Sequence, residues 1–206
     1  MRAECTLTLA LLADRRDNWT AAASALAARV HDARAELFDR VDRVKHAAPQ
    51  GLKTRLHGDL HLGQVLVCRD DFFVIDFEGE PQRSFDERRA KHSALRDVAG
   101  MLRSCVCARH TALHQVAQGA AQIERLAPVA RRWERRVREA FLETYRDVAQ
   151  ASGLYGEPGG FGAAVSLLDL FELEKALYEL RYEIDNRPDW VGVPLAGIAA
   201  LAGIAT

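Results

Sequence analysis

Residues 57–80 read HGDLHLGQVLVCRDDFFVIDFEGE, and the rest of the chain is organised around this stretch. Two short apolar runs, 65–67 and 72–75, flank a polar turn, which is typical of a β-hairpin. A polar loop precedes the first run, and a group of carboxylates follows the second. Because the strands of a hairpin are antiparallel, the loop and the carboxylates lie at the same end of it. The sequence therefore predicts a site on a rigid support.

The spacing of the polar residues fits phosphoryl transfer. Protein-kinase-like catalytic loops follow the pattern H-x-D-x-x-x-x-N, with an Asp-Phe-Gly turn after the next hairpin. His57, Asp59 and Gln64 occupy these positions, with Gln in place of Asn, and the run Asp-Phe-Glu-Gly begins at Asp76. An acceptor hydroxyl needs a carboxylate to take its proton, which makes Asp59 the candidate base. Mg²⁺ prefers hard oxygen ligands, which Gln64 and Asp76 can supply.

Two other interpretations of the loop stay open. His57 taken alone is typical of a buried, hydrogen-bonded structural histidine. Alternatively, His57, Asp59 and His61 could be the ligands of a metallohydrolase, because alternate residues of a strand point the same way. Gly58 and Gly63 favour a loop over a strand, and no second histidine cluster follows at a suitable distance.

Length and composition narrow the class of protein. The chain has 206 residues, enough to bury a core, and its net charge of −1 gives no electrostatic argument for nucleic acid or an anionic membrane. Its four cysteines form no C-x-x-C pair, which favours reduced thiols. The apolar run 6–13 lacks a cleavage site, and the tail 191–206 is too short to span a bilayer. We expect a soluble, cytoplasmic protein with no nucleic-acid or membrane partner.

Outside the hairpin, apolar residues recur at helical spacing. Helices are expected over 18–46, over 95–120, from 128 onward and over 163–184. Pro128 marks the third start, because proline is tolerated in a first helical turn. The third helix carries an apolar stripe expected to pack in the core, formed by Trp133, Val137, Phe141, Tyr145 and Val148. The glycine-rich segment 153–162 is expected to be a flexible connector.

Two features beside the hairpin bear on the site. Asp97 lies near the start of the second predicted helix. Its carboxylate either caps that helix or braces the catalytic loop from behind. The charged stretch 82–91 is expected to form a loop or short helix over the site.

The motifs HGDLHLGQVL and VIDFEGEP resemble the catalytic and metal-binding motifs of bacterial maltokinases, which are aminoglycoside-phosphotransferase-like kinases. The match continues through SALRDVAGMLRS (93–104) and EKALYELRYEIDNRPDWVGVPLAGI (174–198). It therefore covers most of the chain from about Arg55 onward. The resemblance implies transfer of phosphate from ATP to the anomeric hydroxyl of maltose. The product, maltose 1-phosphate, feeds α-glucan synthesis, and the domain is sometimes fused behind a trehalose synthase.

The resemblance also implies roles for individual residues. Asp59 looks like the catalytic base, and Gln64 and Asp76 look like the Mg²⁺ ligands. Glu78 either assists the metal or accepts a hydrogen bond behind it. His57 and Asp97 are the supporting residues of the loop.

The sugar is implied to lie near His61 and the tail, where Glu179, Glu183 and Trp190 are the candidates. A carboxylate accepts hydrogen bonds from sugar hydroxyls, and an indole stacks on a sugar face. The alternative is a packed tryptophan and two solvated glutamates.

The implied fold class is α+β, mostly helical: a protein-kinase-like C-terminal lobe with the N-lobe absent. A complete kinase of this type has an N-terminal lobe that covers ATP and supplies a lysine. The lysines present are Lys45, Lys53, Lys91 and Lys175, and none lies in a strand paired with a glycine loop. One lobe is expected over 1–206. Its expected parts are leading helices (1–50), the catalytic loop and metal-binding hairpin (51–80), a helical subdomain (81–190) and a tail (191–206).

Several alternatives follow from the expected lack of an N-lobe. The chain is a truncated product, a fragment of a fusion or a subunit completed in trans, and the isolated chain is expected to bind nucleotide weakly. The acceptor could instead be glucosamine, another small sugar or an aminoglycoside. A non-catalytic remnant that binds a partner is the alternative from another class of function.

Overall fold

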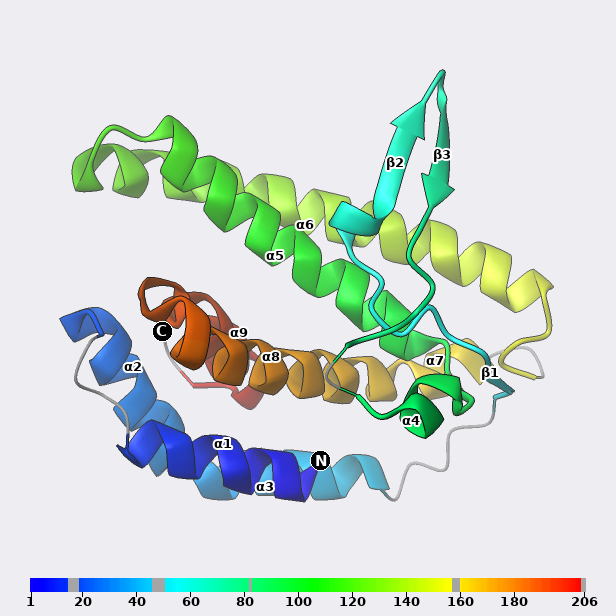
Figure 1. Ribbon diagram of the computed structural model, residues 1–206, viewed down its shortest axis with the longest axis horizontal. Helices are drawn as coiled ribbons and strands as arrows, with labels where there is room; N and C mark the ends of the chain where they lie inside the picture. Colours follow the sequence, from blue (N-terminus) through cyan, green and yellow to red (C-terminus); the bar gives the residue numbers. More distant parts are fainter. Residues whose placement is uncertain (15–18, 46–50, 82, 157–159, 205–206) are drawn as a thin grey trace. The chain divides into compact units, whose positions relative to one another are not determined.

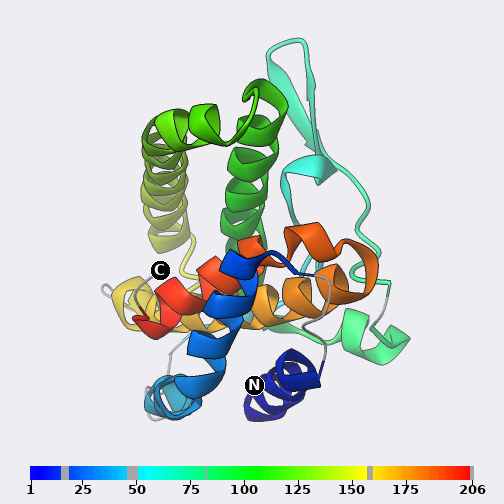
Figure 2. The same ribbon diagram turned by 90° about the vertical axis from the view of Figure 1, so that its left-hand side faces the viewer.

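The computed structural model describes residues 1–14, 19–45, 51–81, 83–156 and 160–204 (Figure 1, Figure 2). Its elements group into two compact units: Met1–Ala48 with Asp169–Thr206, and Pro49–Leu168. The fold is mostly helical with few strands, as the sequence predicts.

The first unit is a set of helices around a shared apolar core. It contains α1 (Arg2–Asp14), α2 (Ala21–Asp32), α3 (Arg34–Lys45), α8 (Ser166–Asn186) from Asp169 onward, η2 (Pro188–Trp190) and α9 (Gly192–Ala202). The fully buried side chains include Leu12, Leu37, Leu177, Leu180, Leu195 and Ile198. Arg181 joins α8 to α1 by donating hydrogen bonds to the Thr8 hydroxyl at 2.8 Å and the Glu4 carboxylate at 2.6 Å.

The expected single helix over 18–46 is wrong, because the chain turns at Ala33. Thr20 caps α2 by accepting the backbone N–H of Ala23 at 3.2 Å, and Ala33 ends this helix immediately before α3 begins. Val30 before the break and Leu37 after it are both buried in the same core. The apolar spacing therefore continues through the turn and does not reveal it. Residues 18 and 46 lie outside the described part of the chain.

The predicted hairpin is confirmed in the second unit. Strands β2 (Val65–Cys68) and β3 (Asp71–Val74) pair antiparallel, with Val65 opposite Val74. Arg69 and Asp70 form the turn, and both have positive φ, 49° and 64°, as the tightest two-residue hairpin loops require. Both views show the hairpin projecting away from α5 and α6 (Figure 1, Figure 2). A second small pair, β1 (Lys53–Thr54) with β4 (His92–Ser93), was not expected from the sequence.

The second unit also contains the helices α4 (Phe85–Arg89), α5 (Leu95–Val116), α6 (Ala120–Ala151) and α7 (Gly160–Ala164). The short helix expected within 82–91 corresponds to α4. The expected helix start at Pro128 is wrong, because α6 begins eight residues earlier and continues through this proline. Proline removes one backbone hydrogen bond inside a helix, and the remaining turns of this long helix maintain it. None of the helices in the described part of the chain has the length and apolar character that a bilayer crossing needs.

The apolar stripe of α6 is only partly buried, so the expectation of core packing is wrong for two of its members. Trp133 is 46% exposed and Val148 is 66% exposed. The glycine-rich segment after α6 is packed at its edges, because Tyr155 and Phe161 are buried and the hydroxyls of Tyr145 and Tyr155 lie 2.7 Å apart. Residues 157–159 of this segment lie outside the described residues.

Candidate active site

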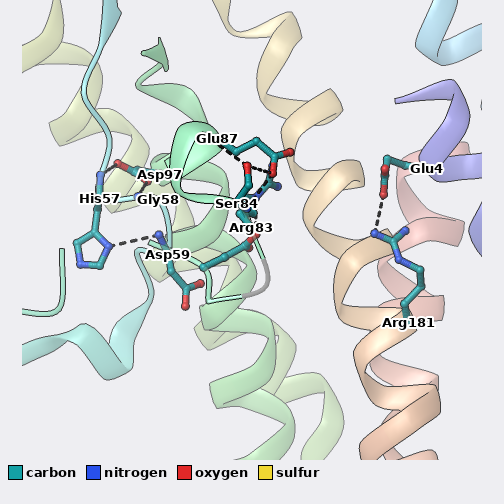
Figure 3. Close-up of polar contacts among 10 residues, drawn as sticks. Glu4, His57, Gly58, Asp59, Arg83, Ser84, Glu87, Asp97 and Arg181 are labelled. Atoms are coloured by element: carbon teal, nitrogen blue, oxygen red, sulfur yellow. Dashed lines mark hydrogen bonds and ion pairs between the residues drawn. The ribbon is translucent and has the colours of Figure 1, made fainter. Parts of the chain in front are cut away.

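His57 fixes the loop that precedes the hairpin. Its side chain is buried, and both ring nitrogens are in hydrogen-bond contact. Nδ1 accepts the backbone N–H of Asp59 at 3.3 Å (Figure 3). The proton therefore lies on Nε2, which donates to the carbonyl of Ile75 at 2.7 Å. The ring therefore ties the loop to the residue immediately before Asp76.

This geometry argues against the metallohydrolase alternative. With both nitrogens engaged, His57 has no lone pair left for a metal. Within the described ranges, no group of three or more His, Cys, Asp or Glu residues is placed to hold a metal ion.

Asp97 holds the backbone of the same loop. From the first turn of α5, its carboxylate accepts the N–H of His57 at 2.7 Å and the N–H of Gly58 at 3.0 Å (Figure 3). The residue at the cap position of α5 is Ala94, whose side chain cannot accept a hydrogen bond. Of the two roles suggested for Asp97, the structure shows the bracing role: the carboxylate makes charge-assisted hydrogen bonds to the loop.

Helix α5 supports the loop at two further points that the sequence analysis missed. A side chain at Gly100 would place its Cβ only 2.6 Å from the carbonyl oxygen of Leu60, so the loop can lie on the helix only because this residue is glycine. One turn later, the Ser104 hydroxyl accepts the N–H of Leu62 at 3.1 Å. An isolated glycine inside a helical pattern was the available signal.

Asp59 and His61 lie side by side on this loop. His61 Nε2 is 4.0 Å from the Asp59 carboxylate, and His61 Nδ1 accepts the N–H of Gly63 at 3.0 Å. The Asp59 side chain is 25% exposed, so a hydroxyl from solvent can reach it. This carboxylate is positioned to accept a proton from a bound hydroxyl.

Gln64 and Asp76 meet at the base of the hairpin. The side-chain amide of Gln64 donates to the Asp76 carboxylate at 2.8 Å. The backbone carbonyl of Gln64 accepts the N–H of Ile75 at 3.0 Å. Asp76 has φ of 64°, a left-handed conformation that is costly for a residue other than glycine. Its carboxylate is exposed. In this arrangement the amide nitrogen of Gln64 faces Asp76, and turning the amide over would instead place its oxygen beside the carboxylate, as a hard cation such as Mg²⁺ requires.

The remaining acidic residues of the turn differ in their surroundings. Glu78 is exposed, and its backbone carbonyl accepts a hydrogen bond from Arg88 at 3.3 Å. Glu80 is only 4% exposed and forms an ion pair with Arg83 at 2.7 Å. Asp76 and Glu78 are therefore the carboxylates that face solvent.

The tail candidates lie in the first unit, around an arginine that the sequence analysis missed. Arg187 donates to both oxygens of Glu183, at 2.6 and 2.8 Å, and its guanidinium lies 4.7 Å from the ring centre of Trp190. Burial raises the pKa of Glu183, Arg187 acts in the opposite direction, and the negative charge of Glu179 adds to the increase. The structure thus brings Glu179, Glu183 and Trp190 together, whereas His61 belongs to the second unit.

Comparison with known proteins relates the chain to sugar kinases. No family model matches it. It is 34% identical over 149 residues to a glucosamine kinase of Mycolicibacterium smegmatis, covering 70% of this chain and 33% of that protein. A glucosamine kinase of Streptacidiphilus jiangxiensis is 29% identical over 142 residues, covering 68% of this chain and 29% of that protein. The chain therefore spans about a third of the length of these curated relatives.

Solved structures give the same relationship. A glucosamine kinase (crystal form A) superposes with a TM-score of 0.68 at 24% identity, covering 98% of this chain and 44% of that one. A glucosamine kinase in complex with glucosamine, ADP and inorganic phosphate gives a TM-score of 0.67 at 25% identity. The match covers 97% of this chain and 42% of that one. The chain has the fold of the part of these enzymes that it spans. The homologues are glucosamine kinases, so these comparisons support a relationship to sugar kinases but not the expected assignment to the maltokinases.

Proposed function

We propose that this chain, a homologue of part of the glucosamine kinases, is the catalytic part of an enzyme that transfers phosphate from ATP to a small sugar. The observation that carries the proposal is the grouping of Asp59, Gln64 and Asp76. The first two lie on one loop, and the third is joined to Gln64 by a hydrogen bond of 2.8 Å. The loop is fixed from behind by His57 and Asp97.

Asp59 is proposed as the base that orients the acceptor hydroxyl and takes its proton. General-base catalysis requires a carboxylate within hydrogen-bond reach of the hydroxyl. The hydrogen bond from the Asp59 N–H to His57 and those from the neighbouring amides to Asp97 fix the backbone from which this carboxylate projects. His61, whose Nε2 is 4.0 Å from this carboxylate, is proposed to contact the same sugar hydroxyl.

Gln64 and Asp76 are proposed as the Mg²⁺ ligands, with Glu78 nearby on the same turn. Mg²⁺ is usually held by one or two protein groups, with phosphate oxygens and waters completing the octahedron, and an exposed carboxylate next to an amide fits this pattern. When bound, the cation neutralises charge on the phosphate groups of ATP.

Glucosamine is proposed as the first candidate acceptor, with maltose as the second. The relatives named above are glucosamine kinases, which makes this amino sugar the first acceptor to test. Maltose is supported by the motifs IDFEGEP and RPDW.

The exposed hairpin supports the proposal that a further polypeptide segment completes the kinase. Val67 is 82% exposed, Phe72 is 65% exposed and Phe73 is 56% exposed. Val67 and Phe72 are cross-strand partners, and exposed apolar strands are sites of association. The solved kinase that holds ADP is matched over only 42% of its length, so such enzymes contain much more chain than this one. An N-lobe or a fused domain, supplied in the same polypeptide or in trans, is the proposed occupant. A non-catalytic partner-binding module would use the same surface.

Phosphate transfer from Mg·ATP to glucosamine and to maltose tests the function. The purified chain would be compared with a chimera in which it replaces the matching region of the Mycolicibacterium smegmatis glucosamine kinase. We expect the chimera to form a sugar phosphate and the Asp59→Asn chimera to form none. Asp86→Asn, which alters an exposed carboxylate of α4, is the matched control. A folded chimera without transfer to either sugar would overturn the proposal.

A further inference from the structure

Asp76 has a strained backbone, and such a conformation persists only when its surroundings hold it. On its N-terminal side the restraint is clear. Ile75 donates its N–H to the Gln64 carbonyl at 3.0 Å, and its own carbonyl accepts from His57 at 2.7 Å. On its C-terminal side, at residues 77–80, the turn needs a restraint of its own.

Arg88 lies against that side of the turn. Its Nη1 donates to the carbonyl of Glu78 at 3.3 Å. Gly79 has φ of 78°, and a Cβ added there would meet Cγ and Cδ of Arg88 at 3.3 and 3.4 Å. The arginine side chain therefore lies across the face of Gly79 that a larger residue would fill. A Cβ at Gly58 would lie 3.1 Å from the Cα of Gly79, so the turn also touches the catalytic loop.

The helix that carries Arg88 is itself fixed. Ser84 and Glu87 form a capping box at the start of α4, with the Ser84 N–H donating to Glu87 at 2.9 Å and the Glu87 N–H donating to Ser84 at 3.3 Å (Figure 3). Just before this helix, Arg83 pairs with the buried Glu80 at 2.7 Å. The short helix is thus attached to the turn at Glu80 and at Glu78.

Arg88 also carries a buried donor that the rest of the structure does not use. Its Nε has no hydrogen-bond partner among the described residues. Burying a donor without an acceptor is unfavourable, so other contacts of Arg88 must offset this cost. The neighbouring turn, which carries Asp76, is the feature that the side chain contacts.

We propose that Arg88 is a positioning residue that holds the turn 76–80, so that the Asp76 carboxylate stays beside Gln64 and can bind the cation. This inference rests on the proposed function, because it assumes a metal at Gln64 and Asp76. Arg88 acts through the backbone of Glu78 and Gly79 and does not contact the metal.

Binding of Mn²⁺ to the full chain, followed by electron paramagnetic resonance, tests the inference. Loss of a group that orients a metal ligand typically weakens metal affinity about 10-fold or more. We expect Arg88→Gln to raise the dissociation constant of Mn²⁺ by about 10-fold. Arg88→Lys, which keeps the alkyl chain over Gly79 and a donor for Glu78, should recover part of the affinity. Arg89→Gln, on the same helix but over the ring of Phe85, is the control and should leave the affinity unchanged.

The melting temperature of each variant separates positioning from general loss of structure. A weakened Mn²⁺ site at an unchanged melting temperature supports the inference. If Arg88→Gln unfolds, the dissociation constants of Mn²⁺ for Arg88→Lys and wild type are compared instead. A weaker site in Arg88→Lys supports the role of Arg88. Equal Mn²⁺ affinity in wild type, Arg88→Gln and Arg88→Lys would overturn the role of Arg88 alone. Mn²⁺ binding that is absent in wild type or insensitive to Asp76→Asn would overturn the metal site itself, and the inference with it.

Discussion

The carboxylate of Asp97 accepts the backbone N–H of His57 at 2.7 Å, across forty residues of sequence. It accepts the N–H of Gly58 with its other oxygen, so a single side chain fixes two consecutive amides of the catalytic loop. Two oxygens facing two donors is an arrangement that only a carboxylate can provide.

Asp97→Asn is therefore expected to destabilise the chain. The substitution turns one acceptor into an NH₂ group that faces a backbone N–H, which leaves a donor unsatisfied. We expect the free energy of unfolding to fall by about 1–3 kcal/mol. Urea denaturation measures it, with Asp86→Asn, an exposed carboxylate on α4, as the control. Equal losses in the two variants would contradict the bracing role.

Gly100→Ala is expected to move the catalytic loop. The added methyl group would lie 2.6 Å from the carbonyl oxygen of Leu60, so the loop must shift away from α5. Overpacking of this kind typically costs about 1–3 kcal/mol. Gly162→Ala is the matched control, since an added Cβ there meets no described residue beyond its own helix and chain neighbours. Thermal unfolding compares the two, and a Gly100→Ala variant as stable as wild type would contradict the packing.

His110 on α5 is expected to make stability depend on pH. Its pKa is lowered from 6.5 to about 4, first by burial, then by His114, whose ring centre is 4.2 Å away, and by Arg109. A histidine with a lowered pKa in the folded state contributes its stability above pH 6.5, and this contribution is lost as the pH falls toward 4. We expect a loss on the order of 1 kcal/mol over this window.

The substitution His110→Gln should flatten this part of the stability profile. Urea denaturation at several pH values between 6.5 and 4 measures it, with His31→Gln on α2 as the control. If His110→Gln retains the full wild-type slope, another group is responsible.

The hairpin is expected to make the isolated chain associate with itself. Its two strands expose Phe72 and Phe73 on a small sheet with open edges, and exposed apolar strands are sites of association. Phe72→Thr with Phe73→Thr should shift the chain toward monomer in sedimentation velocity without lowering its melting temperature. Leu180→Ala, which removes a fully buried side chain, should instead lower stability by about 2–5 kcal/mol. A hairpin variant that melts earlier while remaining associated would contradict this prediction.

The hairpin could be predicted because its signals are local, and the candidate site residues lie in the same stretch of sequence. Strand alternation, a two-residue turn and the offsets from His57 to Asp76 all lie within one continuous stretch of sequence. The sequence also suggested two roles for Asp97. The loop that its carboxylate contacts is forty residues away, so only the folded chain shows the hydrogen bonds.

The errors have a common physical cause. Ala33 interrupts a helix whose apolar spacing continues undisturbed, and α6 continues through Pro128 because its other turns maintain it. Trp133 has the spacing of a core residue and is 46% exposed, since burial depends on which neighbours pack against a helix. Spacing identifies a helical face but does not show what covers it.

The sequence by itself determined the mostly helical character and the hairpin, and it supplied the candidate residues for the proposed chemistry. These features follow from short-range patterns of polarity and turn propensity. The tertiary structure alone decided how the site is held: Leu60 against Gly100, Glu78 against Arg88, and Glu183 with Trp190 around Arg187. Leu60 and Gly100 are forty residues apart, and even the contacts between nearer residues depend on side-chain geometry that exists only after the backbone has folded.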